Sequence, residues 1–169
     1  MYIRKAEHND IELIHNLGFE CFRATYTGRM SEPQMDFMLD MMYSVENITR
    51  QIHQLGHVYY IGYQDDEPFG FVSLECQAPA LYHLQKIYLR ESAQGKGLGR
   101  VLIEYAFDRA LTDCGGECTV ELNVNRGNQR AIDFYNKMGM HCDRTGDFAI
   151  GEGFYMNDYI MAIKLGAQQ

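Results

Sequence analysis

One segment in the middle of the chain constrains the fold more than any other. Residues 84–89 form a strand-like run rich in β-forming side chains, and residues 94–100 follow as a loop with three glycines that opens a helical pattern. Glycine lets the backbone approach a ligand closely, and the N–H groups and positive dipole end of a helix favour an anion. Lys96 and Arg100 add positive charge beside the loop. The segment therefore predicts a strand, a phosphate-binding loop and a helix.

Spacing separates the phosphate-binding motifs that this loop resembles. A Walker loop requires Ser or Thr after Gly-Lys, whereas Gly97 follows Lys96 here, so no hydroxyl is placed to hold magnesium. A dinucleotide-binding fingerprint requires glycine at the position of Arg100 and a strand that opens the fold, yet this strand is about the fourth. A glycine-rich turn without a ligand is the remaining alternative.

The rest of the chain alternates between helical and strand periodicity, without internal repeats or linkers. Helices are predicted from a cap at Asn9 or Asp10 to Gly28, from Ser31 to Met42, from Ser44 to Ile52, and over 97–112 and 128–138. Strands are predicted at 2–5, 58–63, 69–76, 82–89, 119–124, 141–150 and 154–165, with a hairpin turn at 65–68. At 169 residues, the chain is expected to form one α/β (α+β) domain over 1–169.

Composition excludes several classes of function. The net charge of -8 argues against nucleic-acid binding, which needs a basic surface. Residues 1–80 hold 5 Lys and Arg against 12 Asp and Glu, an excess that favours a cationic partner or is a solvated surface. Neither a signal-like start nor 18 consecutive apolar residues occurs, so we expect no membrane attachment and a cytoplasmic protein. The five scattered cysteines are expected to be reduced, with no metal site.

Two motifs resemble the GNAT superfamily of N-acetyltransferases. Residues 94–99 match its acetyl-CoA loop, Gln/Arg-x-x-Gly-x-Gly/Ala, at every defined position. Residues 128–140 resemble its second signature, an Asn followed by Ala-Ile, Phe-Tyr and a terminal Gly-Phe, with Met140 in place of the Phe. The resemblance covers about residues 2–165. It implies a GNAT fold, with a mixed central sheet of about seven strands, flanking helices and a splayed parallel strand pair that holds acetyl-CoA as cosubstrate.

The resemblance also implies roles for individual residues. The pantetheine arm of acetyl-CoA would pair with the strand end, the loop would hold the pyrophosphate, and a helix start would bind the cofactor, which gives the cofactor-binding set Ile87, Tyr88, Leu89, Gln94, Gly95, Lys96, Gly97, Leu98, Gly99, Arg100, Asn128 and Tyr135. A plain N-cap is a compatible role for Asn128. Tyr135, two helical turns after Asn128, would be the catalytic general acid, or else only a packing residue.

Chemistry at the acceptor is less constrained. A protonated amine must lose a proton before it attacks the thioester. The proton could pass to Glu75, His83, Glu121 or a water. Gln85 could only orient a water, and Asn123 lies on the same strand as Glu121. Strand alternation pairs His83 with Gln85 and Glu121 with Asn123 without showing which faces meet the cleft.

Within the superfamily, the chain most resembles bacterial spermidine/spermine N-acetyltransferases of the PaiA type. The matching segments are 20–22, 25–26, 84–89, 137–139, 145–146 and 158–162. This resemblance implies a small polyamine as acceptor, bound near 26–31 and 151–155, with Glu20 and Asp158 as substrate-binding carboxylates; Glu32 and Glu152 lie close in sequence. It also allows a homodimer.

Two other functions stay open at this point. One is a protein acetyltransferase that acts on a lysine or an N-terminus. The other is an acetyl-CoA-binding regulatory module without catalysis.

Overall fold

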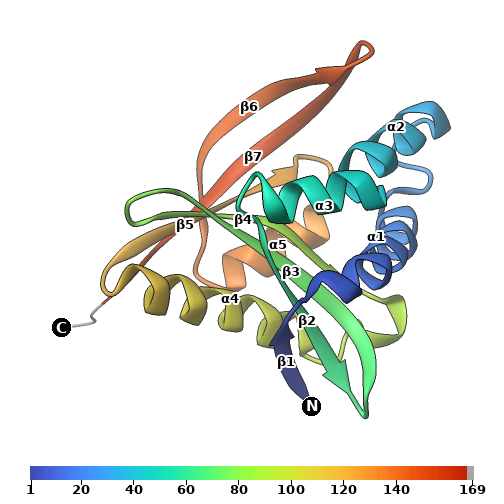
Figure 1. The fold of residues 1–169 in the computed structure, drawn as a ribbon. Helices are drawn as coiled ribbons and strands as arrows, with labels where there is room; N and C mark the ends of the chain where they lie inside the picture. Colours follow the sequence, from blue (N-terminus) through green and yellow to red (C-terminus); the bar gives the residue numbers. More distant parts are fainter. Residues whose placement is uncertain (167–169) are drawn as a thin grey trace. The chain divides into compact units, whose positions relative to one another are not determined.

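The computed structural model describes residues 1–166, and its helices and strands follow the predicted order (Figure 1). The strands are β1 (Tyr2–Lys5), β2 (Val58–Gln64), β3 (Glu67–Ala78), β4 (Leu81–Leu89), β5 (Cys118–Asn125), β6 (His141–Gly151) and β7 (Phe154–Leu165). The helices are α1 (Ile11–Tyr26), α2 (Glu32–Tyr43), α3 (Val45–His53), α4 (Leu98–Cys114) and α5 (Gln129–Lys137), with short 3₁₀ turns η1 (His8–Asp10) and η2 (Glu91–Ala93).

The strands form one seven-stranded mixed sheet in the order β1-β2-β3-β4-β5-β7-β6. β4 and β5 run parallel, whereas β1 with β2, β2 with β3, β5 with β7 and β6 with β7 pair antiparallel. A parallel pair needs a crossover, and α4 supplies it between β4 and β5. The predicted α/β class, with its mixed sheet and parallel pair, is confirmed.

The chain divides into two compact units. Unit 1 consists of Met1–Glu75 and Lys86–Ala106, and unit 2 of Cys76–Gln85 and the chain from Phe107 onward. The single domain expected over residues 1–169 stays a prediction. No helix of residues 1–166 is long and apolar enough to cross a membrane.

In unit 1 the three N-terminal helices bury the apolar stripes that their sequence predicts. Ile14, Leu17 and Phe22 of α1 are at most 1% exposed, as are Met35 and Leu39 of α2. The hydroxyls of Ser31 and Ser44 accept hydrogen bonds at 3.3 Å from backbone N–H groups in the first turns of α2 and α3, as their cap positions predict. These local signals therefore position the helices of unit 1.

The turn between β2 and β3 is shorter than its sequence predicts. The prediction of a turn over 65–68 is wrong for residues 67 and 68. Gln64 pairs with Glu67, so only Asp65 and Asp66 connect the strands. Both have positive φ, 52° and 63°, as a two-residue turn of type I′ requires. Asp tolerates this left-handed conformation, and the Pro that suggested a loop lies inside β3 instead.

Unit 2 has one apolar and one polar sheet face, because side chains alternate along each strand. Val120, Leu122 and Val124 of β5 and Met161 of β7 are at most 5% exposed. Ile132 and Tyr135 of α5, both 8% exposed, add to the buried set. The other face of β5 carries Thr119, Glu121, Asn123 and Asn125, which are half-buried or exposed.

A lysine lies in the core of unit 1. Lys86 of β4 is 6% exposed, and its ammonium donates a hydrogen bond of 2.8 Å to Oε1 of Gln51 on α3. Its Nζ also lies 5.3 Å from the ring centre of Tyr59 and 5.7 Å from that of Tyr43. Burial lowers the pKa of Lys86 to about 7, against a weaker opposing effect of Glu75. The core therefore holds an amine whose charged form is costly.

Replacement of Lys86 by Met should change how stability depends on pH. Between about pH 7 and pH 10.5 the unfolded chain binds a proton at this lysine that the folded chain does not, so wild-type stability rises with pH in that window. The rise is at most about 1.4 kcal/mol per pH unit. Denaturant unfolding should therefore give Lys86→Met a higher free energy of unfolding than the wild type at pH 7, and this difference should decrease toward pH 10. The exposed Lys5→Met is the control, and equal pH dependence of all three proteins would contradict the prediction.

Candidate functional site

The glycine-rich loop lies between β4 and α4 in unit 1, as its sequence predicts. Gln94 ends the η2 turn in an extended conformation, and Gly95 and Gly97 follow with φ of 75° and 78°. A side chain is strained at such φ values, so glycine suits both positions. Apart from the glycine itself and its two chain neighbours, no atom of the described residues lies within 4 Å of a Cβ built at either position. The loop backbone is therefore open on the side where a side chain would stand.

The side chains around this loop are held within unit 1. Nε2 of Gln94 donates to the backbone oxygen of Leu89 at 3.4 Å, which ties the loop to the end of β4. Arg100, in the first turn of α4, donates to Glu104 at 2.7 Å, so part of its expected positive charge is neutralised. Ile87, Tyr88 and Leu89 are half-buried.

The end of β4 comes very close to β3. A Cβ at Gly70 would lie 2.4 Å from the backbone oxygen of Tyr88, a distance that no side chain allows. The ring of Tyr88 packs against the rings of Phe22, Tyr43 and Phe71. The strand segment that leads into the loop is thus fixed by both backbone and aromatic contacts.

Asn128 caps α5 and Tyr135 lies on it, both in unit 2. Oδ1 of Asn128 accepts from the backbone N–H of Ala131 at 3.3 Å, which is the N-cap role that its position predicts. The cap engages only Oδ1, so the amide N–H donors of the same side chain are compatible with a ligand. Tyr135, 8% exposed, lies two helical turns later. Met140, in the position of the usual Phe, is 3% exposed.

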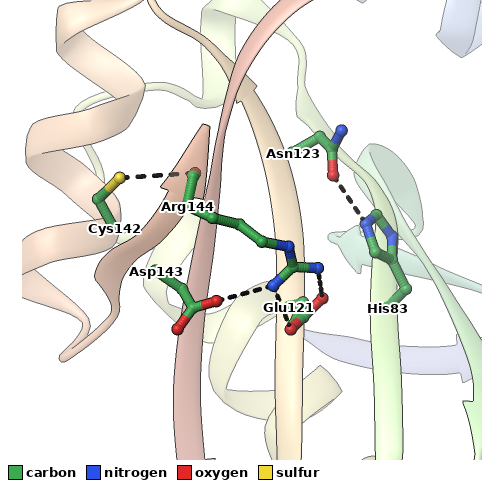
Figure 2. Close-up of polar contacts among 6 residues, drawn as sticks. All are labelled: His83, Glu121, Asn123, Cys142, Asp143 and Arg144. Atoms are coloured by element: carbon green, nitrogen blue, oxygen red, sulfur yellow. Dashed lines mark hydrogen bonds and ion pairs between the residues drawn. The ribbon is translucent and has the colours of Figure 1, made fainter. Parts of the chain in front are cut away.

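The polar face of unit 2 carries two of the three candidate bases. The parallel register places His83 of β4 beside Glu121 of β5, and the antiparallel register places Asp158 of β7 beside Asn125. Arg144 of β6 reaches the same face and donates to both oxygens of Glu121, at 2.9 and 2.8 Å, and to Asp143 at 2.8 Å (Figure 2). The hydrogen bonds from Arg144 hold the pKa of Glu121 below its ordinary value. A carboxylate held in this way is a poor proton acceptor.

His83 has a different environment on this face. Its Nε2 lies 3.0 Å from Oδ1 of Asn123 (Figure 2), and Nδ2 of Asn123 donates to Oδ2 of Asp158 at 3.2 Å. Asp158 is 1% exposed, and burial raises the pKa of its carboxyl, against the opposing effects of Asn123 and Arg126. Sequence alternation left His83 and Asn123 on separate strands of unknown facing; the register brings them together.

Two further predicted residues, Glu75 and Glu20, lie in unit 1. Glu75 of β3 has an oxygen 3.8 Å from Nε2 of the buried His57. Glu20 of α1, with its side chain half-exposed, accepts from Nε of Arg90 at 3.2 Å. Sequence reasoning missed Arg144 and Lys86, because neither belongs to a motif and both act through partners distant in sequence. Within residues 1–166, no group of three or more His, Cys, Asp or Glu side chains is arranged to hold a metal ion.

Comparison with known proteins gives a consistent result. The model of the acetyltransferase (GNAT) family matches residues 14–140. The chain is 26% identical over 137 residues to the peptidyl-lysine N-acetyltransferase YjaB of Escherichia coli (strain K12), which covers 81% of this chain and 80% of that protein. It is 26% identical over 147 residues to a spermidine N(1)-acetyltransferase of Thermoplasma acidophilum, which covers 85% of this chain and 89% of that protein.

A solved structure extends the likeness over nearly the whole chain. The PaiA N-acetyltransferase of Thermoplasma acidophilum, crystallised in complex with coenzyme A, matches with a TM-score of 0.78 and 25% sequence identity. The match covers 97% of this chain and 98% of that one.

The loop geometry makes a prediction about acetyl-CoA. A β-branched residue is strongly disfavoured at the positive φ of Gly97, so Gly97→Val should distort the loop and weaken acetyl-CoA binding by about tenfold or more. Gly56→Val is the matched control, because Gly56 has φ of 76° and equally open space in the turn before β2. Calorimetry should show the wild-type dissociation constant for the control. Equal affinities of the two variants, or a wild-type affinity no better than for a mononucleotide, would contradict the prediction.

Proposed function

Because this chain belongs to the acetyltransferase (GNAT) family, we propose that it transfers the acetyl group of acetyl-CoA to a primary amine of a polyamine by direct attack. Membership makes the chain an acetyl-CoA-dependent N-acetyltransferase. The finer choice of a polyamine rests on one observation, the match to a spermidine N(1)-acetyltransferase over 85% of this chain. The acidic excess of residues 1–80 agrees with a cationic acceptor.

The proposal assigns the cofactor to the residues that the two motifs predict. The open backbone of Gly95 and Gly97, with the first turn of α4, would hold the pyrophosphate, and Lys96 would add positive charge. The backbone of residues 87–89 would pair with the pantetheine arm, and Asn128 would bind the cofactor while it caps α5. These contacts use backbone groups, one amide and the charge of Lys96 at the pyrophosphate, so they would bind acetyl-CoA without activating its thioester.

Tyr135 is the proposed general acid. Attack of an amine on the thioester expels a thiolate, and a phenol near the sulfur can protonate it. The buried position of Tyr135 on α5, two turns after Asn128, suits a side chain that faces the cofactor rather than solvent. No covalent acyl-enzyme is required by this route.

Tyr135→Phe should lower turnover by about 10²-fold or more while it leaves the fold and the acetyl-CoA dissociation constant unchanged, because only the proton donor is lost. The high-pH limb of the rate profile should disappear with it. Tyr105→Phe is the matched control, since Tyr105 is also a helical tyrosine with little exposure, and its ring contact with Tyr60 needs no hydroxyl. Turnover of Tyr135→Phe equal to that of the control, with chemistry rate-limiting, would reduce Tyr135 to a packing residue.

Glu20 and Asp158 are the proposed acceptor-binding carboxylates. Glu20 is half-exposed and shares its charge with Arg90, so a polyamine would compete with that arginine for it. Asp158 is buried, and it would attract a cation through its charge rather than through surface contact. A homodimer and a cytoplasmic location stay predictions, which gel filtration and cell fractionation would test.

A polyamine acceptor predicts strong dependence on salt. The Michaelis constant for spermidine should rise severalfold between low and physiological ionic strength, because exposed ionic attractions are screened beyond about 8 Å there. Glu20→Gln should raise it in the same direction, whereas Glu12→Gln, an exposed neutralisation on the same helix, should not. A neutral monoamine should show no such salt dependence. More efficient turnover of neutral-chain monoamines than of any polyamine would contradict the choice of acceptor and leave the acetyltransferase intact.

A second acceptor class has its own supporting observation. YjaB, a peptidyl-lysine N-acetyltransferase, matches 81% of this chain at the same identity as the spermidine enzyme. A peptide lysine presents one ammonium on a long chain, whereas a polyamine presents several. Competition between spermidine and a lysine peptide, read by mass spectrometry of both products, distinguishes the two acceptors.

A further inference from the structure

Three polar side chains of unit 2 form a hydrogen-bonded chain whose order determines where the proton of the His83 ring lies. Nδ2 of Asn123 donates to Asp158, because a carboxylate oxygen can only accept from an amide. Oδ1 of Asn123 is therefore the atom that faces His83, and it is an acceptor. Nε2 of His83 must then carry a hydrogen and donate it. The other ring nitrogen, Nδ1, is left with a lone pair in the neutral ring.

Nδ1 of His83 is the atom with proton-accepting capacity. It is buried, and it has no hydrogen-bond partner among residues 1–166. The neighbouring Glu121 already accepts two hydrogen bonds from Arg144. Of the two candidate bases on this face, only His83 thus has an acceptor atom that takes no hydrogen bond from the described residues, whereas both oxygens of Glu121 accept one.

Carboxylates outnumber arginines among the charged groups on the face that carries His83. Glu121 of β5 lies beside it in register, Asp158 of β7 stands behind Asn123, and Asp143 of β6 adds a third carboxylate. Arg144 of β6 and Arg126 oppose them, but each is paired, the first with Glu121 and Asp143 and the second with Asp147. Oδ1 of Asn123 accepts the hydrogen of Nε2 whether the His83 ring is neutral or charged. The ring therefore keeps one orientation while Nδ1 gains and loses a proton.

We propose that His83 is the general base of the transfer, with Asn123 and Asp158 as positioning residues that fix its tautomer and orientation. The proposal rests on the proposed function, since it assigns the proton acceptor of that same reaction. Asp158 has a cost that agrees with this role: it is a buried carboxyl whose Oδ1 has no hydrogen-bond partner within the described chain. Burying a carboxylate oxygen without a partner costs folding free energy. The presence of Asp158 at this position therefore agrees with a functional need for its charge.

Each proton and electron pair of the transfer has a defined destination. Nδ1 takes one proton from the acceptor ammonium, directly or through one water, and later releases it to solvent. The freed nitrogen lone pair forms a bond to the thioester carbonyl carbon, and the carbon–sulfur bond breaks with its electron pair on sulfur. The thiolate takes a proton from Tyr135, and the second proton of the new amide nitrogen returns to Tyr135 through water.

The first experiment measures kcat/KM for spermidine against pH. The wild type should show a low-pH limb that levels off when His83 is neutral. His83→Gln should lower kcat/KM by about 10²-fold or more, and its rate should keep rising with pH, because only amine already deprotonated in solution can react. Acetyl-CoA affinity should not change, and added imidazole should restore part of the rate. His141→Gln, an exposed histidine at the start of β6, should behave as the wild type.

The positioning residues are tested by variants that separate hydrogen bond from charge. The amide introduced by Asp158→Asn can still accept from Asn123, so this variant should fall less in kcat than Asp158→Leu, with its low-pH limb displaced because a neighbouring negative charge is gone. Asn123→Leu should lower kcat by about tenfold or more and leave KM near the wild-type value. If Asn123 and Asp158 had a structural role alone, these variants would change the free energy of unfolding and leave the low-pH limb of the rate profile in place.

A spectroscopic measurement makes the outcome independent of folding in the variants. The ¹⁵N shifts of wild-type His83, assigned by its absence from His83→Gln, should show hydrogen on Nε2 and none on Nδ1 at high pH. A hydrogen on Nδ1, or a His83→Gln profile equal to the wild type, would overturn the assignment of His83 and leave the acetyltransferase standing. Failure of the wild type itself to acetylate any amine would overturn the proposed function and His83 with it.

Discussion

The short parallel pairing of β4 with β5 is the constraint on which the chemistry of unit 2 depends. The register covers only Leu81–His83 against Thr119–Glu121, although β4 continues to Leu89 and β5 to Asn125. Because side chains alternate strictly along a strand, three paired residues suffice to put His83 on the same face as Glu121 and Asn123. A slip of one residue would exchange this polar face with Val120 and Leu122, which are buried. Core packing therefore fixes the register, and the register fixes the polar neighbours.

On the polar face of unit 2, the ion pair of Arg144 with Glu121 leaves the neighbouring His83 able to accept a proton. Arg144 binds Glu121 through two parallel hydrogen bonds, an arrangement that holds a carboxylate ionised and in place. That pairing removes Glu121 as a proton acceptor, but its charge remains close to His83. The Arg144 pair is half-exposed and adds little to stability by itself. Its effect on the chemistry of its neighbours is the larger one.

Sequence reasoning succeeded where the signal is local. The glycine-rich loop, the caps at Ser31, Ser44 and Asn128, and the alternation of β5 are each encoded within a few residues, so their conformations follow from neighbouring side chains. The turn at Asp65 and Asp66 was predicted in place but too long, because Pro68 suggests a loop and yet fits into a strand. There, tertiary pairing overrides a local preference.

The other features could not be predicted because they depend on pairing between strands that are distant in the sequence. The contact between Arg144 and Glu121 requires the register of β6 on β7, which shifts between Cys142 and Arg144 at an irregularity that no motif marks. Lys86 belongs to the predicted strand 84–89 and has no predicted role, and only the packing of Gln51 and Tyr59 around it reveals a core amine.

The same distinction explains why the cosubstrate is easier to infer than the acceptor. The proposed acetyl-CoA site consists of backbone and glycine geometry that short motifs encode, so the likeness to N-acetyltransferases persists at 26% identity. The acceptor depends instead on a sum of charges from separate elements. On the polar face of unit 2 that sum is negative, because Glu121, Asp143 and Asp158 outnumber Arg144, and Arg126 is paired with Asp147. An excess of carboxylates attracts an ammonium group and disfavours an anion. This excess supports the proposal of a cationic acceptor but does not distinguish a polyamine from a lysine. The first ammonium is common to both, and only the charge on the remainder of the acceptor differs.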